Sequence, residues 1–308
     1  MFKNTSEKSF IKSLGPKLDS FKTTLRLLIR NPGSAIGLII VLIYIVIAII
    51  DEVDPSLLGL TGNINILSTN PTAPIPIPPS LAYPFGTSVY GINLYQGVMK
   101  AIRIDVAFSF LVVGAGSLIG IILGLYAAYY GGIVDEILMR ITDIFFSIPL
   151  LVLIIAAGFF IPNGRSIGVL AIILIILWWP TYARVVRGQV LSLKELSYVE
   201  AARSCGVGQT KIMFKHILPN TLAPVIVQLS FDLASVVLLL STLDFLGFIP
   251  SGGLLADLGL LTALGYPEFD IGYWWALLVP SFAILLFALS MNLLGDGMRD
   301  AFDPRLRR

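Results

Sequence analysis

Few residues in this sequence of 308 are of the types that carry out chemistry. It holds one cysteine, Cys205, and one histidine, His216, which excludes a metal site built from several thiolates or several imidazoles. No Gly-x-x-x-x-Gly-Lys-Ser/Thr string occurs, so the chain lacks a phosphate-binding loop of its own. We therefore expect no catalytic residue, no metal and no cofactor in this chain, and we expect it not to be an enzyme.

The most unusual titratable groups are two carboxylates, Asp232 and Asp244, inside an otherwise apolar stretch. An ionisable group at membrane depth normally faces a cavity or a partner rather than lipid. Asp232 is therefore a candidate for a translocation pathway, and a structural hydrogen bond to a neighbouring span is the equal alternative. Asp244 lies nearer the end of the stretch, where we expect it to be solvated. Asp143 follows Arg140 by three residues, which predicts a pair near a helix end.

Two further patterns concern helix packing and the membrane boundary. Four glycines at nearly four-residue spacing predict a close helix contact; they are Gly114, Gly116, Gly120 and Gly124. Two adjacent pairs of tryptophans predict anchors at the membrane interface; they are Trp178, Trp179, Trp274 and Trp275.

The elements that must position these groups are membrane spans. Hydrophobic residues make up 56% of the chain and charged residues only 13%, which excludes a soluble globule. About 20 apolar residues cross a bilayer as a helix. Five uncharged runs of about this length or longer occur, and a sixth is interrupted by the two aspartates. The runs are 31–50, 106–134, 144–164, 166–183 and 271–295, and the interrupted one is about 221–248.

The basic residues predict how these spans are oriented. Of the 21 Lys and Arg residues, 17 lie before the first span, between the fourth and fifth spans, or after the last. Basic residues resist translocation, so all three segments are expected to be cytoplasmic. Six spans place them on one side. The sequence thus predicts an all-α polytopic membrane protein with both termini cytoplasmic.

The cytoplasmic segment 184–219 contains the one motif that indicates a function. Ser197 and Glu200 have the spacing of a capping box, which predicts a short helix running through Ala201 and Ala202. Gly206 and Gly208 should break this helix, and a second helix should run over about 209–217 and stop near Pro219. The result would be a helix-turn-helix at the inner membrane surface, with alanines small enough for another protein to approach.

This segment resembles the EAA loop of permease subunits of ATP-binding-cassette importers. That pattern is Glu-Ala-Ala, three residues, glycine and, about ten residues later, an apolar position followed by Leu-Pro. The matching residues are Glu200, Ala201, Ala202, Gly206, Leu218 and Pro219. In that family the loop forms the coupling helix that docks in a groove of the cytoplasmic ATPase, and the resemblance assigns this role to these six residues.

Other stretches are similar to the C-type permease of dipeptide and oligopeptide importers. They include 124–135, the Ser147-Ile148-Pro149 turn, 182–189 and 292–305. The resemblance implies a type I importer permease fold in a prokaryotic plasma membrane. It implies four kinds of partner: a second homologous permease, two ATPases that bind ATP and Mg²⁺, an extracytoplasmic solute-binding protein and the lipid membrane. Peptides are the implied substrates.

The uncharged runs, the charge distribution and the resemblance together divide the chain. We expect a cytoplasmic segment with an amphipathic helix (1–30), a first transmembrane helix (31–50) and an extracytoplasmic loop (51–104). A core permease domain of five transmembrane helices (105–296), with its EAA loop at about 190–219, and a cytoplasmic tail (297–308) complete the division.

Two alternatives to a peptide importer remain. Where relatives continue Gly-Thr-Asp, this chain reads Gly86-Thr87-Ser88, so charges expected on the outer side are missing and an oligosaccharide is an alternative substrate. The alternative of another class is a self-contained secondary transporter, which would predict inverted repeats and several buried ion-coupling charges. We find no such repeat.

Overall fold

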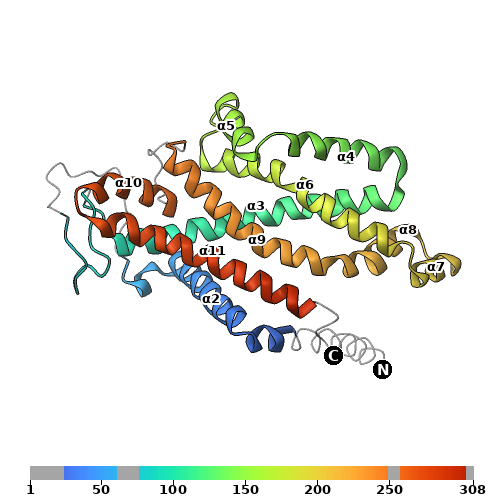
Figure 1. The fold of residues 1–308 in the computed structure, drawn as a ribbon, viewed down its shortest axis with the longest axis horizontal. Helices are drawn as coiled ribbons and strands as arrows, with labels where there is room; N and C mark the ends of the chain where they lie inside the picture. The colour runs from blue at the N-terminus through green and yellow to red at the C-terminus, as the bar shows by residue number, and fades with distance from the viewer. Residues whose placement is uncertain (1–23, 61–75, 90, 249–256, 303–308) are drawn as a thin grey trace, which may run out of the picture.

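The computed structural model describes residues 24–60, 76–89, 91–248 and 257–302 of the chain. Within them the chain forms an elongated bundle of helices, with the short helices α7 and α8 at one end and α10 at the other (Figure 1). The elements are α2 (Pro32–Val53), the 3-10 turn η1 (Pro55–Leu58), α3 (Leu94–Tyr130), α4 (Gly132–Ser147), α5 (Leu150–Phe160), α6 (Ile167–Leu193), α7 (Ser197–Ser204), α8 (Gln209–Lys211), the π-helical turn η2 (Ile212–Ile217), α9 (Leu218–Phe245), α10 (Leu258–Asp270) and α11 (Trp274–Phe302).

Six membrane spans follow if one broken helix pair is counted as a single span. In the described part of the chain, five helical segments are long and apolar enough to cross a bilayer, and α4 with α5 satisfies the same test as a pair bent by 90°. The predicted span 144–164 is therefore bent and divided between the end of α4 and α5. The break falls at Ile148 and Pro149, because a proline disfavours helical backbone at the residue before it and cannot donate a backbone hydrogen bond.

The observed helices extend beyond the uncharged runs. α3 begins at Leu94, within the predicted loop 51–104, and is capped by Asn93, whose side chain accepts from the Tyr95 N–H at 3.1 Å. α11 continues to Phe302, into the predicted tail. α10 is an additional helix in a region expected to be loop, begun by Asp257, which accepts from the Leu260 N–H at 2.7 Å. Charges do not end helices; they only interrupt the hydropathy signal.

The predicted N-terminal amphipathic helix lies mostly outside the described residues. Residues 24–30 are helical, and Leu28 among them is buried. Asn31 then caps α2 by accepting from the Gly33 N–H at 3.1 Å, and its side-chain nitrogen lies 3.5 Å from an Asp300 carboxylate oxygen. The beginning of α2 and the end of α11 therefore meet at the same end of the bundle.

The helix α3 packs closely on α6 through glycine. A Cβ atom added at Gly120 or Gly124 would lie 2.4 Å from the carbonyl oxygen of Trp179 or Ala183, respectively. An added Cβ at Gly116 would lie 2.9 Å from the Cβ of Trp178, whereas one at Gly114 would meet nothing within 4 Å. The predicted close contact is confirmed for three of the four glycines.

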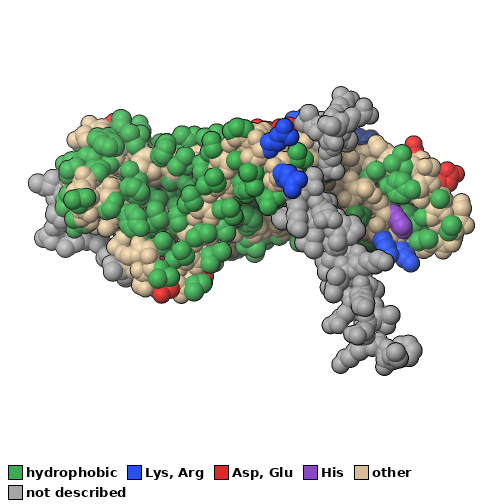
Figure 2. Space-filling model, turned by 90° about the horizontal axis from the view of Figure 1, so that it is seen from below, with side chains coloured by type: hydrophobic (Ala, Val, Ile, Leu, Met, Phe, Trp, Pro, Cys, Tyr) green, Lys and Arg blue, Asp and Glu red, His purple; other side chains and the backbone are tan. Residues whose placement is uncertain are grey.

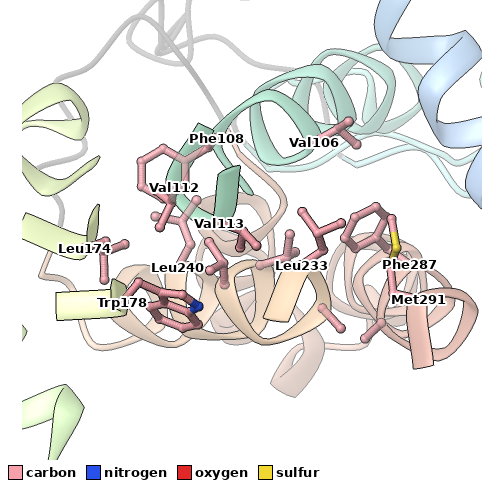
Figure 3. Packing of buried hydrophobic residues seen from close by; sticks show 14 of the residues in the cluster. Val106, Phe108, Val112, Val113, Leu174, Trp178, Leu233, Leu240, Phe287 and Met291 are labelled. Atoms are coloured by element: carbon pink, nitrogen blue, oxygen red, sulfur yellow. The ribbon is translucent and has the colours of Figure 1, made fainter. Parts of the chain in front are cut away.

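The core lies where four helices cross. Figure 3 shows side chains of α3, α6, α9 and α11 directed into this region, among them Val112, Leu174, Leu240 and Phe287, and all four are buried. By contrast, hydrophobic side chains also cover much of the outer surface, with charged side chains gathered mainly toward one end of the face seen in Figure 2. An apolar exterior of this kind is expected of a protein whose solvent is lipid.

Candidate functional site

The helix α7 carries the Glu-Ala-Ala motif at one end of the bundle. It begins at Ser197, and its N-cap is Leu196, which makes no side-chain capping bond. The predicted capping box is therefore wrong, because Ser197 already lies within the helix. Glu200 is exposed in the first turn, where a carboxylate is favoured by the positive end of the helix dipole.

One face of α7 is anchored and the other is open. Val199 is completely buried in the main hydrophobic core, and Ala202 packs against that core while half-buried. Glu200 and Ala201 are exposed. The motif therefore presents a small, rigidly held surface with one negative charge, which is suited to close contact with another protein.

Only one of the two glycines after α7 is required by the backbone. Gly206 adopts φ +73°, and it donates its N–H to the Arg203 carbonyl at 2.9 Å while Val207 donates to Ala202 at 3.1 Å. This left-handed residue ends the helix in the way that glycine does at many helix C-termini. Gly208 has φ −59°, which any residue can adopt.

The second helix of the motif does not stop at Pro219. It continues from Gln209 through η2 and α9 to Phe245 as one segment of 37 residues. In η2 the Leu218 N–H bonds to the Met213 carbonyl, five residues back, and Pro219 then occupies the first turn of α9, where its missing N–H costs little. Half-buried Leu218 and exposed Pro219 thus stand at the junction, and α7, which packs on η2, is coupled directly to a membrane span.

Ion pairs hold α4 against α6 near this end. Arg187 makes a bidentate pair with Asp135 at 2.6 and 2.7 Å, and Arg184 pairs with Asp143. The predicted pair between Arg140 and Asp143 is wrong, since Arg140 lies instead 3.8 Å from Glu136. Asp143 turns toward α6 because the neighbouring helix offers a guanidinium there.

Asp232 is buried in the middle of α9 and is fully hydrogen-bonded. The indole N–H of Trp178 donates to one carboxylate oxygen at 3.0 Å, and the Gln228 amide donates to the other at 2.9 Å. A cavity of about 270 Å³ lies beside it, lined also by Pro149, Pro180 and Thr181. The carboxylate is therefore next to the break between α4 and α5.

The sequence predictions are wrong for three of the four tryptophans and for Asp244. Trp178 and Trp179 are buried rather than interfacial, and Trp275 is buried and donates to the Thr87 carbonyl at 3.0 Å; only Trp274 is half exposed. Asp244 is not solvated: only 3% of its surface is exposed, and it lies near Asp257, the N-cap of α10. Among the described residues, no group of three or more potential ligands is arranged to hold a metal ion.

Spacing could have identified part of this site. Gln228 and Asp232 are four residues apart and so share a helix face, as do Arg184 and Arg187. The partners of these pairs on other helices, Trp178 and Asp135, carry no signal that the sequence alone reveals.

Comparison with known proteins identifies the family of the chain. Residues 120–308 match the family described as the binding-protein-dependent transport system inner membrane component. The chain is 35% identical to the dipeptide transport system permease protein DppC of Bacillus subtilis over 237 residues, which cover 75% of this chain and 72% of that protein.

Two other relatives are similar to the same extent. The chain is 34% identical to the dipeptide transport system permease protein DppC of Haemophilus influenzae over 291 residues, covering 91% and 92% of the two chains. It is 36% identical to the glutathione transport system permease protein GsiD of Pectobacterium atrosepticum over 234 residues, covering 74% and 75%.

Proposed function

The chain belongs to the family of binding-protein-dependent transport system inner membrane components, and on that premise we propose that it is a permease subunit of an ATP-driven importer of short peptides. The observation that supports this most directly is the exposed α7, which is joined without interruption to the span α9. A self-contained transporter would have no use for such a docking element.

The motif residues would pass movement from an ATPase into the membrane. Glu200 and Ala201 form the exposed docking surface, Ala202 and Val199 fix α7 to the bundle, and Gly206 sets the turn between the two helices. When two ATPases close on ATP, a displacement of α7 is carried through η2 to α9. Alternating access follows if α9 and the break between α4 and α5 respond together.

The importer would be a complex. We place beside this chain a second homologous permease, two cytoplasmic ATPases and an extracytoplasmic solute-binding protein. This chain itself is non-catalytic, and ATP with Mg²⁺ is bound by the ATPases. Two alternatives to peptide import remain: the same role in an importer of oligosaccharides and, in another class, a self-contained secondary transporter.

Short peptides are favoured as substrates for two reasons. The relatives compared above are named for dipeptide and glutathione transport. In addition, Asp232 supplies a negative group beside a cavity between spans, which could attract the ammonium terminus of a peptide. A neutral sugar offers no such charge.

The proposed orientation places both termini and α7 in the cytoplasm of a prokaryotic cell, with α10 outside. Single cysteines on a Cys205→Ser background test it. We expect a membrane-impermeant thiol reagent to label Leu81→Cys, which is fully exposed, and not Glu195→Cys, beside α7. If the reagent labels only position 195 in intact cells, the orientation is the opposite of the one proposed.

The assembly is tested by purification and reconstitution. The affinity-tagged chain, extracted in mild detergent, should bring a second permease and ATPases with it. Reconstituted vesicles should take up a dipeptide only when ATP and the ATPases are present. Uptake driven by an ion gradient in the absence of ATPases would instead establish the secondary transporter.

A further inference from the structure

A groove of about 510 Å³ separates α2 from α3 on the outer surface of the bundle, at the end opposite α7. Almost all of its lining is apolar, from side chains of both helices: Ile45, Ala48, Ile49, Val106, Ala107 and Phe110. This volume is within the range of small-molecule sites. The groove is not part of the cavity at Asp232, and no role described so far uses it.

The surroundings of the groove face lipid. On α2 the side chains of Ile39, Ile43 and Val46 are each about half exposed. α2 has 22 residues and a length close to the thickness of the hydrocarbon core, so residues near Val53 lie at the membrane boundary. An apolar occupant that enters from the side would therefore be an acyl chain.

A charged cluster closes the groove at this boundary. Arg103 of α3 pairs with Asp51 at 3.1 Å and with Glu52 at 2.7 Å. Asp51 is buried, whereas the Glu52 side chain is 72% exposed and the Arg103 side chain 33% exposed. Arg103 and Glu52 also line the groove. The groove therefore offers charged side chains to the polar end of a ligand and, directly beside them, an apolar surface to its hydrocarbon chain.

The charges of this cluster indicate the headgroup. Two carboxylates and one guanidinium leave one net negative charge, which favours a cation. The two ion pairs engage Nε and one terminal nitrogen of Arg103. Among the residues that the structure describes, no ion pair engages the other terminal nitrogen, which can donate to a phosphate. Glu52 can accept from an ammonium group on the same headgroup. A headgroup with a phosphate and a primary ammonium satisfies both, whereas an anionic headgroup without the ammonium would be repelled by Glu52.

We propose that the groove between α2 and α3 binds one membrane phospholipid with an ammonium-bearing, zwitterionic headgroup, its acyl chain against Ala107 and its headgroup beside the Arg103–Glu52 ion pair. The inference rests on the membrane-spanning fold and not on the transported solute. The bound lipid would fill the space beside α2 and hold that helix against α3.

Native mass spectrometry of the full-length chain in detergent tests this proposal. The protein is incubated with equal amounts of dioleoyl phosphatidylethanolamine and dioleoyl phosphatidylglycerol, and retained lipid is counted. We expect one phosphatidylethanolamine to be retained in preference, by about threefold to fivefold. Ala107→Phe, which fills the groove from an exposed position, should reduce retention of both lipids, while Leu118→Phe, on the exposed surface of the same helix, should not.

Headgroup recognition is tested separately. Glu52→Gln should abolish the preference and leave total retention nearly unchanged; Glu136→Gln, an equally exposed glutamate in an ion pair on α4, serves as the control. Equal retention by wild type and Ala107→Phe would overturn the site, and an unchanged preference in Glu52→Gln would overturn the headgroup assignment. If Ala107→Phe instead releases a co-purified membrane protein without altering lipid retention, the groove is a protein contact and the proposal fails.

Discussion

Trp178 of α6 and Asp232 of α9 are joined by a hydrogen bond of 3.0 Å from the indole N–H to the carboxylate, although 54 residues separate them in the chain. This bond fixes the only described carboxylate that lines the cavity beside the α4 and α5 break. It gives Asp232 a structural role beside its proposed role in the pathway, and the two roles predict different mutant behaviour.

Replacing Asp232 by asparagine removes the charge but keeps most hydrogen bonds. We expect Asp232→Asn to assemble normally and to reduce dipeptide uptake by about tenfold, with a smaller effect on any neutral sugar, because the attraction for an ammonium group is lost. Uptake by reconstituted complexes, normalised to assembled protein, measures this. Asp296→Asn, at an exposed position on α11, is the control. Equal rates for wild type and Asp232→Asn would remove Asp232 from the pathway.

The bond itself should stabilise the crossing of α6 and α9. Trp178→Phe leaves a carboxylate oxygen without its donor and should lower the free energy of unfolding by about 1–3 kcal/mol. In an Asp232→Leu background, Trp178→Phe should lower the free energy of unfolding by less, because no carboxylate oxygen is then left without a donor. Thermal denaturation in detergent measures both, with Trp274→Phe at a half-exposed position as control. If Trp178→Phe lowers the free energy of unfolding equally in both backgrounds, the two side chains are not energetically coupled.

Gly206 and Gly208 form a matched pair for testing the turn after α7. A Cβ atom added at either position would meet nothing within 4 Å, but only Gly206 has a positive φ. Gly206→Leu should therefore raise the conformational free energy of the turn by about 1–2 kcal/mol and uncouple ATP hydrolysis from uptake. Gly208→Leu should change neither the turn nor the coupling appreciably. The ratio of transported solute to hydrolysed ATP measures coupling. Equal behaviour of the two variants would show that the backbone conformation is not what matters.

Glu200 should matter for docking rather than folding. Glu200→Arg reverses the exposed charge of α7 and opposes the helix dipole, so we expect insertion to be normal and binding of the ATPases to weaken by about tenfold. Co-purification of ATPases at increasing salt measures this. Undiminished binding and transport in Glu200→Arg would count against a coupling role for α7.

The glycines of α3 should differ sharply in their tolerance of alanine. Gly120→Ala and Gly124→Ala place a Cβ against backbone of α6 and should destabilise the bundle by several kcal/mol, about 1–3 for overpacking and more where the helices must separate. Gly114→Ala meets no atom and should be neutral or stabilising by up to about 1 kcal/mol. Melting temperatures rank the three. Tolerance of alanine at Gly120 would contradict the close approach.

Glu268 of α10 should make stability depend on pH. It is buried and accepts from the Val89 N–H at 3.0 Å through one oxygen, and its other oxygen has no hydrogen-bond partner among the described residues. Burial raises its pKa from 4.5 to about 7, although the Val89 bond opposes this. The folded state binds the Glu268 proton more tightly than the unfolded state does. The stabilisation that protonated Glu268 adds to the free energy of unfolding is therefore complete below pH 4.5 and is lost as the pH rises through 7.

The comparison of wild type with Glu268→Gln isolates this contribution. The free energy of unfolding of wild type should fall relative to that of Glu268→Gln by roughly 1–3 kcal/mol between pH 4.5 and pH 8. Asp270→Asn, at an exposed position on the same helix, should follow wild type. If the free energies of unfolding of all three proteins change with pH in parallel, the pKa of Glu268 is not raised in the folded protein.

From the sequence alone we predict six spans, the side to which the basic segments belong and the position of the EAA-like loop, and the helices of the structure agree with six spans when the bent pair is counted as one. These features are local: hydropathy, charge and motif spacing are properties of neighbouring residues. The three close glycines of α3 were also readable, because the helical repeat places them on one face.

The tertiary structure decided which distant groups meet. It buried Asp244 beside the cap of α10, turned Asp143 toward Arg184 and brought Trp178 to Asp232. It also carried the helix through Pro219 into α9 by a π-helical turn, where local rules predicted a stop. Such contacts depend on where helices cross and how they are rotated, and the chain between them does not encode this in any short pattern.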